Sequence, residues 1–166
     1  MAATVSPPDP DELPVPELAE DATRCAERLA AADRVLLASH IDADGLTSAA
    51  VASTALERSG IPHEVVFEKQ LDAASVAGIA DRAYDTVLFT DFGSGQLDHI
   101  AAHERAGHFE PVVVDHHQPA SGEAADGGAS ETECHLNPLL RGLNGASELS
   151  GAGAAYVLAR AMEPVG

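Results

Sequence analysis

The chain has 166 residues, of which 45% are hydrophobic, and this is enough for one domain with a single buried core. Its formal net charge is −18, from 27 acidic and 9 basic residues, so the surface as a whole repels a phosphate backbone. The acids are spread along the chain, which favours adaptation to a salt-rich cell interior over a regulatory acidic tail. The overall charge therefore says little about which ligand the protein binds.

The sequence shows no sign of export or of membrane insertion. No apolar stretch approaches the ~20 residues of a membrane span, and the N-terminus lacks the basic-then-apolar order of a secretion signal, so we expect a cytoplasmic protein without membrane contact. Cys25 and Cys134 lie in apolar surroundings and lack CxxC spacing. We expect both to be reduced core residues.

The expected structure begins with a tail. Residues 1–16 are rich in proline and acids, a composition that buries too little apolar surface to offset ordering, so we expect them to be disordered. From Glu17 onward apolar residues recur with helical spacing. This helix leads into residues 34–39, a continuous apolar run typical of a strand buried on both faces.

Helical and strand-like segments then alternate along the rest of the chain. We expect helices at 46–58, 73–82, 96–106 and 151–162, and strands at 63–68, 86–90, 112–114 and, more weakly, 134–137. The composition of residues 121–130 predicts a surface loop. Alternation of this kind predicts an α/β fold, a single domain at 17–166 with a mostly parallel β-sheet flanked by helices on both faces.

Potential metal ligands follow three of the expected strands. In an open α/β sheet, ligands gather beyond the carboxyl ends of parallel strands. Extended backbone would point His40, Asp42 and Asp44 toward one pocket, with Ile41 facing the protein and Gly45 allowing a tight turn into the helix. The other two strand ends carry Asp91, and then Asp115 with His116 and His117.

The chemistry of these side chains suits divalent cations. Aspartates converging on one sheet edge would raise each other's pKa unless bound cations supplied a counter-charge. Carboxylates with imidazoles and no thiolate favour Mn²⁺ or Mg²⁺. Two such ions sharing a carboxylate could activate a water and stabilise a phosphoryl displacement. A lone aspartate would more simply cap its helix, but three such strand ends favour a two-metal phosphoesterase.

Three motifs in this order resemble those of the DHH phosphoesterase superfamily, and most closely its archaeal RecJ-like nucleases. The motifs are SHIDADG at 39–45, TDFGSG at 90–95 and VVDHHQP at 113–119. The resemblance covers about residues 34–162 and implies the Rossmann-like fold of a DHH domain. It also implies that His40 and Asp42 hold one metal ion, that Asp44 and His116 hold the other, and that Asp91 bridges both.

The remaining site residues follow from the same resemblance or stay open. Asp115 would support the neighbouring metal ligand or bind weakly, and His117 would face the substrate phosphate. A fourth motif resembles the segment around Glu148 and Gly151, which could supply a ligand or a phosphate-binding helix start. His135 could point into the cleft or pack as a strand residue. The expected catalytic residues are Asp91, Asp115 and His117.

The favoured function is a Mn²⁺- or Mg²⁺-dependent exonuclease that acts on single-stranded DNA or RNA. One alternative is cleavage of a small substrate, such as a short oligonucleotide, a nucleotide bisphosphate, a cyclic dinucleotide or pyrophosphate. Another is a non-catalytic module of a replication or repair assembly. Family members normally carry a second, C-terminal domain that covers the site. Since nothing after Met162 resembles it, we expect a fragment or a protein partner that supplies it.

Overall fold

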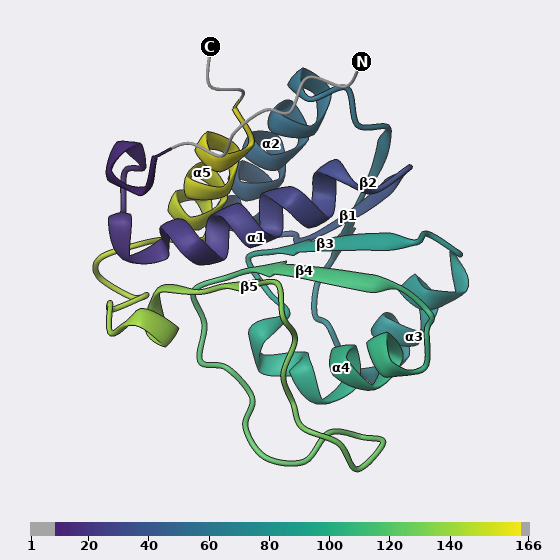
Figure 1. Ribbon diagram of the computed structural model, residues 1–166. Coiled ribbons are helices and arrows are strands. Elements are labelled where there is room, and N and C mark those ends of the chain that lie inside the picture. Colours follow the sequence, from purple (N-terminus) through teal and green to yellow (C-terminus); the bar gives the residue numbers. More distant parts are fainter. Residues whose placement is uncertain (1–8, 164–166) are drawn as a thin grey trace.

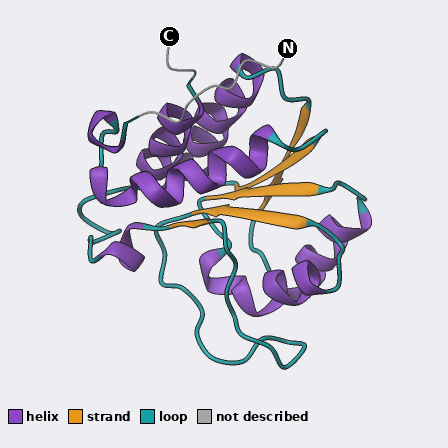
Figure 2. Cartoon of the chain, in the orientation of Figure 1, coloured by secondary structure: helices purple, strands orange, loops and turns teal. Residues whose placement is uncertain are grey.

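A computed structural model describes residues 9–163 and places all five strands in one parallel sheet, in the order β2-β1-β3-β4-β5 (Figures 1 and 2). The strands are β1 (Val35–His40), β2 (His63–Glu68), β3 (Thr86–Thr90), β4 (Glu110–Val114) and β5 (His135–Leu136). The helices are α1 (Ala19–Ala30), α2 (Ala43–Arg58), α3 (Ala73–Asp81), α4 (Leu97–Arg105) and α5 (Gly151–Met162). The predicted α/β class is confirmed.

The strand order determines where a ligand can bind. From β1 the chain passes to β2 on one side, and then returns to place β3 on the other side of β1. The direction of winding therefore reverses between β1 and β3. In open α/β sheets the crevice at such a reversal, beyond the carboxyl ends of the strands, is where ligands bind.

Helices cover both faces of the sheet, with α1, α2 and α5 on one face and α3 and α4 on the other (Figure 1). Consecutive strand residues point to opposite faces, so Leu37 packs in the cluster under α1, α2 and α5, whereas Leu36 and Phe89 pack under α3 and α4. All residues of β3 are buried. Burial on both faces explains why the central strands are continuous apolar runs.

The predicted disordered tail is wrong for residues 9–16. Pro10–Glu12 and Pro16–Leu18 form 3-10 helices, and Leu13 is only 4% exposed and packs in the core cluster of α1, α2 and α5. The average composition of the segment does not reveal that a single leucine within it is buried. Residues 1–8 lie outside the described part of the chain.

Two other expectations concern the thiols and the membrane. Cys25 and Cys134 are both buried and free, as the sequence indicated. Within residues 9–163, no helix combines the length and the apolar character that crossing a membrane requires.

Candidate metal centre

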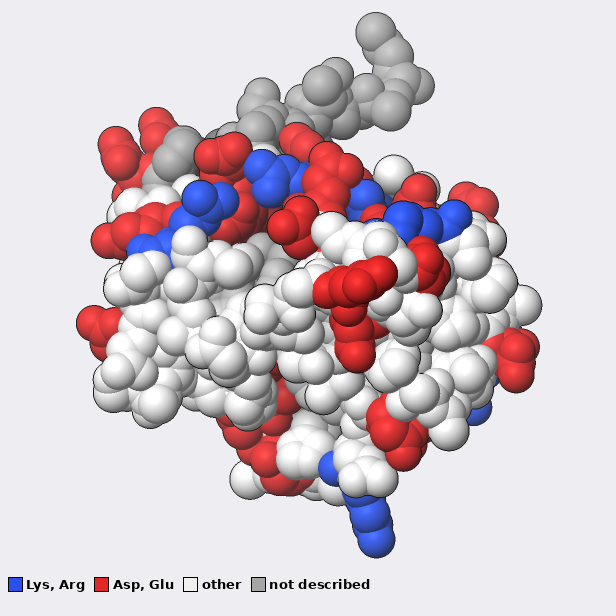
Figure 3. Space-filling model, turned by 90° about the horizontal axis from the view of Figure 1, so that it is seen from below, with Lys and Arg blue, Asp and Glu red and all other residues white. Residues whose placement is uncertain are grey.

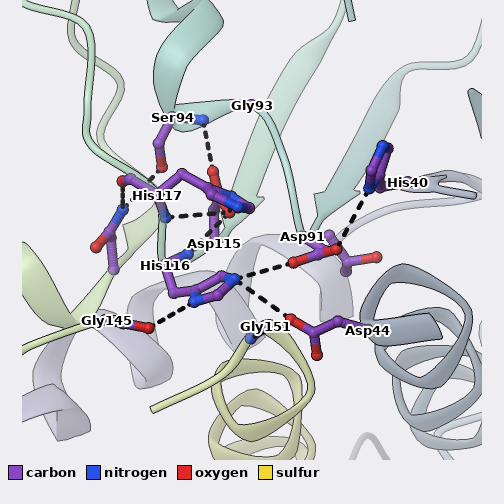
Figure 4. A network of polar contacts seen from close by, with 12 residues as sticks. His40, Asp44, Asp91, Gly93, Ser94, Asp115, His116, His117, Gly145 and Gly151 are labelled. Carbon is purple, nitrogen blue, oxygen red and sulfur yellow. Dashed lines mark hydrogen bonds and ion pairs between the residues drawn. The ribbon is translucent and has the colours of Figure 1, made fainter. Parts of the chain in front are cut away.

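The carboxyl ends of β1, β3 and β4 bring the predicted ligands together. His40 ends β1, Asp91 directly follows β3, and Asp115 directly follows β4 (Figure 4). Ligand atoms within 4.8 Å of one another form two groups that share Asp91. The groups are His40, Asp42 and Asp91, and Asp91, Asp115, His116 and His117. The geometric expectation that these side chains meet at one rim of the sheet is met.

Asp91 lies at the centre of both groups and is energetically unusual. Its side chain is 0% exposed, and its Oδ2 has no hydrogen-bond partner among residues 9–163. Burial, together with the nearby carboxylates of Asp44 and Asp42, raises the pKa of Asp91 to about 8. The residue also adopts a φ of +61°, in the left-handed region that aspartate enters more readily than most residues other than glycine. A buried carboxylate oxygen without a partner is stabilised most directly by a cation.

Asp44 connects the first-turn backbone of α5 to the site. Its Oδ2 accepts a hydrogen bond from the Gly151 N–H at 2.9 Å, and its Oδ1 accepts one from the Ala152 N–H at 2.9 Å. A Cβ on Gly151 would lie 2.3 Å from Asp91 Oδ1, so only glycine fits there. In the structure, the Gly151 and Ala152 amides, which were one candidate for a phosphate-binding helix start, donate to the Asp44 carboxylate.

His116 faces the two aspartates through a fixed ring orientation. Its Nε2 lies 3.1 Å from Asp91 Oδ1 and 3.3 Å from Asp44 Oδ2. Its Nδ1 lies 2.6 Å from the Gly145 carbonyl, which can only accept, so Nδ1 carries the proton. The neutral ring then presents the lone pair of Nε2 to the site, as metal-binding histidines do. Gly145 was not among the predicted site residues, since no motif distinguishes it.

His40 has the same arrangement on the other side of Asp91. Its Nε2 lies 2.9 Å from the Lys69 carbonyl, which assigns the proton to Nε2. Its Nδ1 lies 2.8 Å from Asp42 Oδ2 and 3.8 Å from Asp91 Oδ2. Both histidines thus turn an unprotonated nitrogen toward the shared carboxylate.

The predicted extended path through residues 40–44 is wrong. Asp42 is the N-cap of α2, where its Oδ1 accepts a 2.8 Å hydrogen bond from the Gly45 N–H, and this bond lowers the pKa of Asp42. Asp44 therefore lies in the first helical turn, and Ile41 is 48% exposed instead of facing the protein. Gly45 lies inside α2, and a Cβ there would meet the His40 carbonyl oxygen at 1.9 Å.

Asp115 is as deeply buried as Asp91 but is fully hydrogen-bonded. It accepts hydrogen bonds from the Ser94 N–H at 3.1 Å, the His116 N–H at 2.8 Å and His117 Nδ1 at 2.7 Å (Figure 4). Burial alone would raise the pKa of Asp115, but these bonds outweigh it and lower the pKa. The same contact with Asp115 raises the pKa of His117 to about 8. Asp115 thus holds a largely protonated imidazole at the rim.

The two open candidates lie outside both ligand groups. Glu148 is exposed and accepts a hydrogen bond from the Asn144 N–H. His135 is 7% exposed, and its Nε2 lies 2.7 Å from Ser94 Oγ, which also accepts a hydrogen bond from Asn137. Ser94 and Asn137 were not predicted as site residues, although Ser94 lies within the motif at 90–95 and Asn137 lies two residues after His135.

The donor set at this rim fits divalent cations. Within the described residues it consists of carboxylate oxygens and imidazole nitrogens without sulfur, a combination typical of Mn²⁺ and Mg²⁺. The unpaired Oδ2 of Asp91 supplies a buried acceptor that such an ion would satisfy. The site is therefore a candidate centre for one or two divalent ions.

The fold and the site together define a class of protein. It is a Rossmann-like α/β domain whose sheet carries aspartates and histidines at one rim. The family model described as "DHH family, N-terminal domain" matches residues 34–164. The chain belongs to the DHH family. The resemblance inferred from the three motifs is thereby confirmed.

Relatives extend well beyond this chain. The uncharacterized protein MJ0831 of Methanocaldococcus jannaschii is 28% identical over 124 residues, which are 73% of this chain and 27% of the relative. RecJ from Thermus thermophilus, in its crystal structure in complex with Mn²⁺, has 26% sequence identity to this chain. The TM-score is 0.64, and the match covers 93% of this chain and 22% of that one. This chain thus spans about a quarter of their lengths.

A third similarity bears on the fold alone. The DHH domain of PF0399, described as a member of the s1p family of ribosomal proteins, superposes with a TM-score of 0.67 at 20% identity. It covers 89% of this chain and 39% of the other. The fold therefore occurs in proteins that are described in quite different terms.

Proposed function

We propose that this domain is the metal-dependent core of a RecJ-like phosphoesterase that hydrolyses phosphodiester bonds of single-stranded nucleic acid. The observation that carries the proposal is the buried, unpaired Oδ2 of Asp91, between two histidines whose free nitrogens face it. The similar RecJ from Thermus thermophilus, whose crystals contain Mn²⁺, supports the same interpretation.

In this proposal the ligands fall into two pairs joined by one carboxylate. His40 and Asp42 hold one ion, Asp44 and His116 hold the other, and Asp91 is shared between them. When bound, two divalent cations polarise a phosphoryl oxygen and lower the pKa of a water. The hydrogen bonds from the α5 amides keep Asp44 in place, so little reorganisation is needed when the ions bind.

His117 is the proposed contact with the substrate phosphate. Its side chain is 56% exposed at the rim, and Asp115 holds its proton at Nδ1. With a pKa of about 8, the ring is mostly cationic at neutral pH, so its Nε2–H is available to donate to a phosphate oxygen. It stabilises negative charge that develops during displacement.

The surface charge favours a second candidate, the cleavage of a small substrate. On the face shown in Figure 3, basic side chains gather mainly along one edge and alternate there with acids. Arg24, Arg28 and Arg141, for example, all pair with carboxylates. A face without a basic track holds a long strand weakly at low salt. Three other expectations remain predictions. They are a salt-rich, cytoplasmic setting, a role in DNA repair, and a partner that supplies a second domain.

The test compares substrates and a ligand variant. Labelled single-stranded DNA, RNA and a dinucleotide are incubated with the protein and Mn²⁺ or Mg²⁺, and with the Asp91→Ala variant. We expect metal-dependent release of mononucleotides that Asp91→Ala abolishes and that the surface variant Asp98→Asn retains. Cleavage of the dinucleotide alone selects the small-substrate function. No hydrolysis, with no ion bound in a calorimetric titration, selects the non-catalytic module.

A further inference from the structure

His117 lies in a segment that no helix or strand supports. Residues 115–120, between β4 and the 121–130 loop, have no regular secondary structure. The His117 side chain is 56% exposed at the rim, yet the proposed contact with a phosphate needs its ring in one orientation. Groups outside the segment therefore have to hold it in place.

Ser94 anchors both ends of this segment. Its N–H donates to Asp115 Oδ2 at 3.1 Å (Figure 4), and its carbonyl accepts from the Ala120 N–H at 2.8 Å. Ser94 is buried and begins the 3-10 helix Ser94–Gln96 that follows β3. These two bonds fix the ends of the segment, but neither of them reaches the His117 carbonyl.

Asn137, the residue directly after β5, bonds to that carbonyl. Its Nδ2 donates to the His117 carbonyl at 2.8 Å and to Ser94 Oγ at 2.9 Å. Its Oδ1 accepts from the Leu139 N–H at 2.9 Å. Turning the amide over would set its oxygen against the His117 carbonyl and its NH₂ group against the Leu139 N–H, so the network assigns the orientation. Asn137 is 0% exposed, and both polar atoms of its side chain are bonded.

The bond from Asn137 fixes the His117 backbone on its second side. On the first side, the His117 N–H donates to Asp115 Oδ1 at 3.4 Å. With its N–H and its carbonyl both held, the His117 side chain leaves the segment in a direction that brings Nδ1 to 2.7 Å from Asp115 Oδ1. Without the Asn137 bond, the peptide group after His117 could rotate, and the ring would leave Asp115 more often.

We propose that Asn137 is a positioning residue, which keeps the His117 ring on Asp115 with its Nε2–H directed to the substrate phosphate. The inference rests on the proposed function, because that function gives His117 the phosphate contact. Within the described residues, the side chain of Asn137 bonds to none of the proposed metal ligands. Replacing Asn137 should therefore leave metal binding intact.

The solvent exchange of ring protons in the metal-free protein tests this inference without catalysis. NMR of isotope-labelled histidines follows two of them, Nδ1–H of His117 on Asp115 and Nδ1–H of His116 on the Gly145 carbonyl. In Asn137→Ser we expect the first to exchange about 10-fold faster and the second to keep its native rate. A loosened fold would accelerate both protons, whereas lost positioning accelerates only that of His117.

Two variants separate the bond to His117 from the rest of the buried network. Serine is a favoured N-cap, so Asn137→Ser can still cap the 3-10 helix Pro138–Arg141, although its side chain is too short to reach the His117 carbonyl. Ser94→Ala is the matched control, since it removes the other bond of Asn137 Nδ2 and keeps the one to His117. In Ser94→Ala the His117 proton should exchange at close to its native rate.

Rate measurements connect the positioning role to hydrolysis. With Mn²⁺ and single-stranded DNA, Asn137→Ser should lower kcat/KM about 10-fold. In a His117→Gln background the same substitution should lower it less than about twofold, because the group that it positions is already gone. An active native protein in which Asn137→Ser leaves kcat/KM unchanged, or in which the two substitutions act additively, overturns the inference.

The exchange results distinguish this inference from the proposed function. Equal acceleration of the His116 and His117 protons, the same acceleration in Ser94→Ala, or no protected His117 Nδ1–H in the native protein overturns the positioning role, even if hydrolysis is observed. Acceleration of the His117 proton alone, in Asn137→Ser alone, supports the positioning of the ring. If that protein also hydrolyses nothing, the positioning stands and the phosphoesterase is rejected.

Discussion

Asp91 and Asp115 follow neighbouring strands, and both side chains are 0% exposed, yet their environments are opposite. Four donors, the backbone N–H groups of Ser94, His116 and His117 and the ring Nδ1 of His117, surround Asp115 and lower its pKa. Asp91 keeps an unpaired oxygen beside other carboxylates, and its pKa rises to about 8. Burial alone therefore does not reveal what a carboxylate does. The number of donors that the fold supplies distinguishes a carboxylate that the chain itself satisfies from one that keeps an oxygen without a partner in the described part of the chain.

The largest expected effect comes from replacing the carboxylate that lacks donors. Asp91→Asn should reduce metal-dependent hydrolysis by roughly 10³-fold or more, because a shared ligand supports several kcal/mol of transition-state stabilisation. Steady-state rates with saturating Mn²⁺ measure this loss. A variant that keeps more than a tenth of the native rate would contradict the bridging role.

The same variant should stabilise the metal-free protein. The pKa of Asp91 is raised from 3.8 to about 8, so its contribution to stability is fully present below pH 3.8 and is lost as the pH rises through 8. Asparagine does not titrate. In EDTA, Asp91→Asn should therefore melt at a higher temperature than the native protein, with a larger difference at pH 8 than at pH 5. Equal differences in melting temperature at both pH values would contradict the direction of the Asp91 pKa shift.

Metal affinity should depend strongly on pH. A cation must displace the proton that Asp91 holds below pH 8, so the apparent affinity should rise up to about 100-fold between pH 6 and pH 8. When metal binds at pH 7, Asp91 should release close to one proton per chain. Calorimetric titrations in buffers of different ionisation enthalpy measure this release. Affinity that is constant over this range would show that Asp91 binds no ion.

Asp115→Asn should have a smaller effect on activity and the opposite effect on stability. An amide cannot accept from all of the donors around this position, so the free energy of unfolding should fall by about 3 kcal/mol at pH 7, with or without metal. Activity should fall about 10- to 100-fold, as for groups that orient a ligand. Denaturant unfolding and rate measurements check both. An Asp115→Asn variant more stable than the native protein would contradict the predicted opposite effects of the Asp91 and Asp115 substitutions on stability.

The smallest change in stability should come from replacing His117, the partner of Asp115. Its pKa is raised from 6.5 to about 8, so its stabilising contribution is fully present below pH 6.5 and is lost as the pH rises through 8. Because the ring is largely exposed, His117→Gln should cost less than about 1 kcal/mol at pH 6 and nearly nothing at pH 9 in EDTA. Denaturant unfolding at both pH values tests the trend.

The meeting of strand ends was predictable because it depends on chain topology. Once alternation implied a parallel sheet, Asp91 and Asp115 had to follow strands at the same edge. The local path around Asp42 was not predictable by the same reasoning. Its side chain competes for backbone amides and starts the helix at Ala43, which places Asp44 on a helix instead of a strand extension.

Roles that depend on tertiary contact were also beyond the sequence. Gly145 contacts His116 through its carbonyl, and nothing in its own neighbourhood indicates that contact. Gly151 was noticed, but the amide that looked free in the sequence binds Asp44, which lies 107 residues earlier in the chain. Glu148 was considered as a ligand because of its motif position, whereas its carboxylate bonds to the Asn144 backbone.

The two hydrogen bonds between Asp44 and the first turn of α5 also determine when the candidate metal centre can form during synthesis. During synthesis, the residues of α2 leave the ribosome long before those of α5. Until the last helix docks, Asp44 lacks its two amide donors, and the glycine surface against Asp91 is missing. A nascent chain that ends before Gly151 lacks the two amide donors of Asp44, so under the proposed function it should bind metal more weakly than the chain that includes α5.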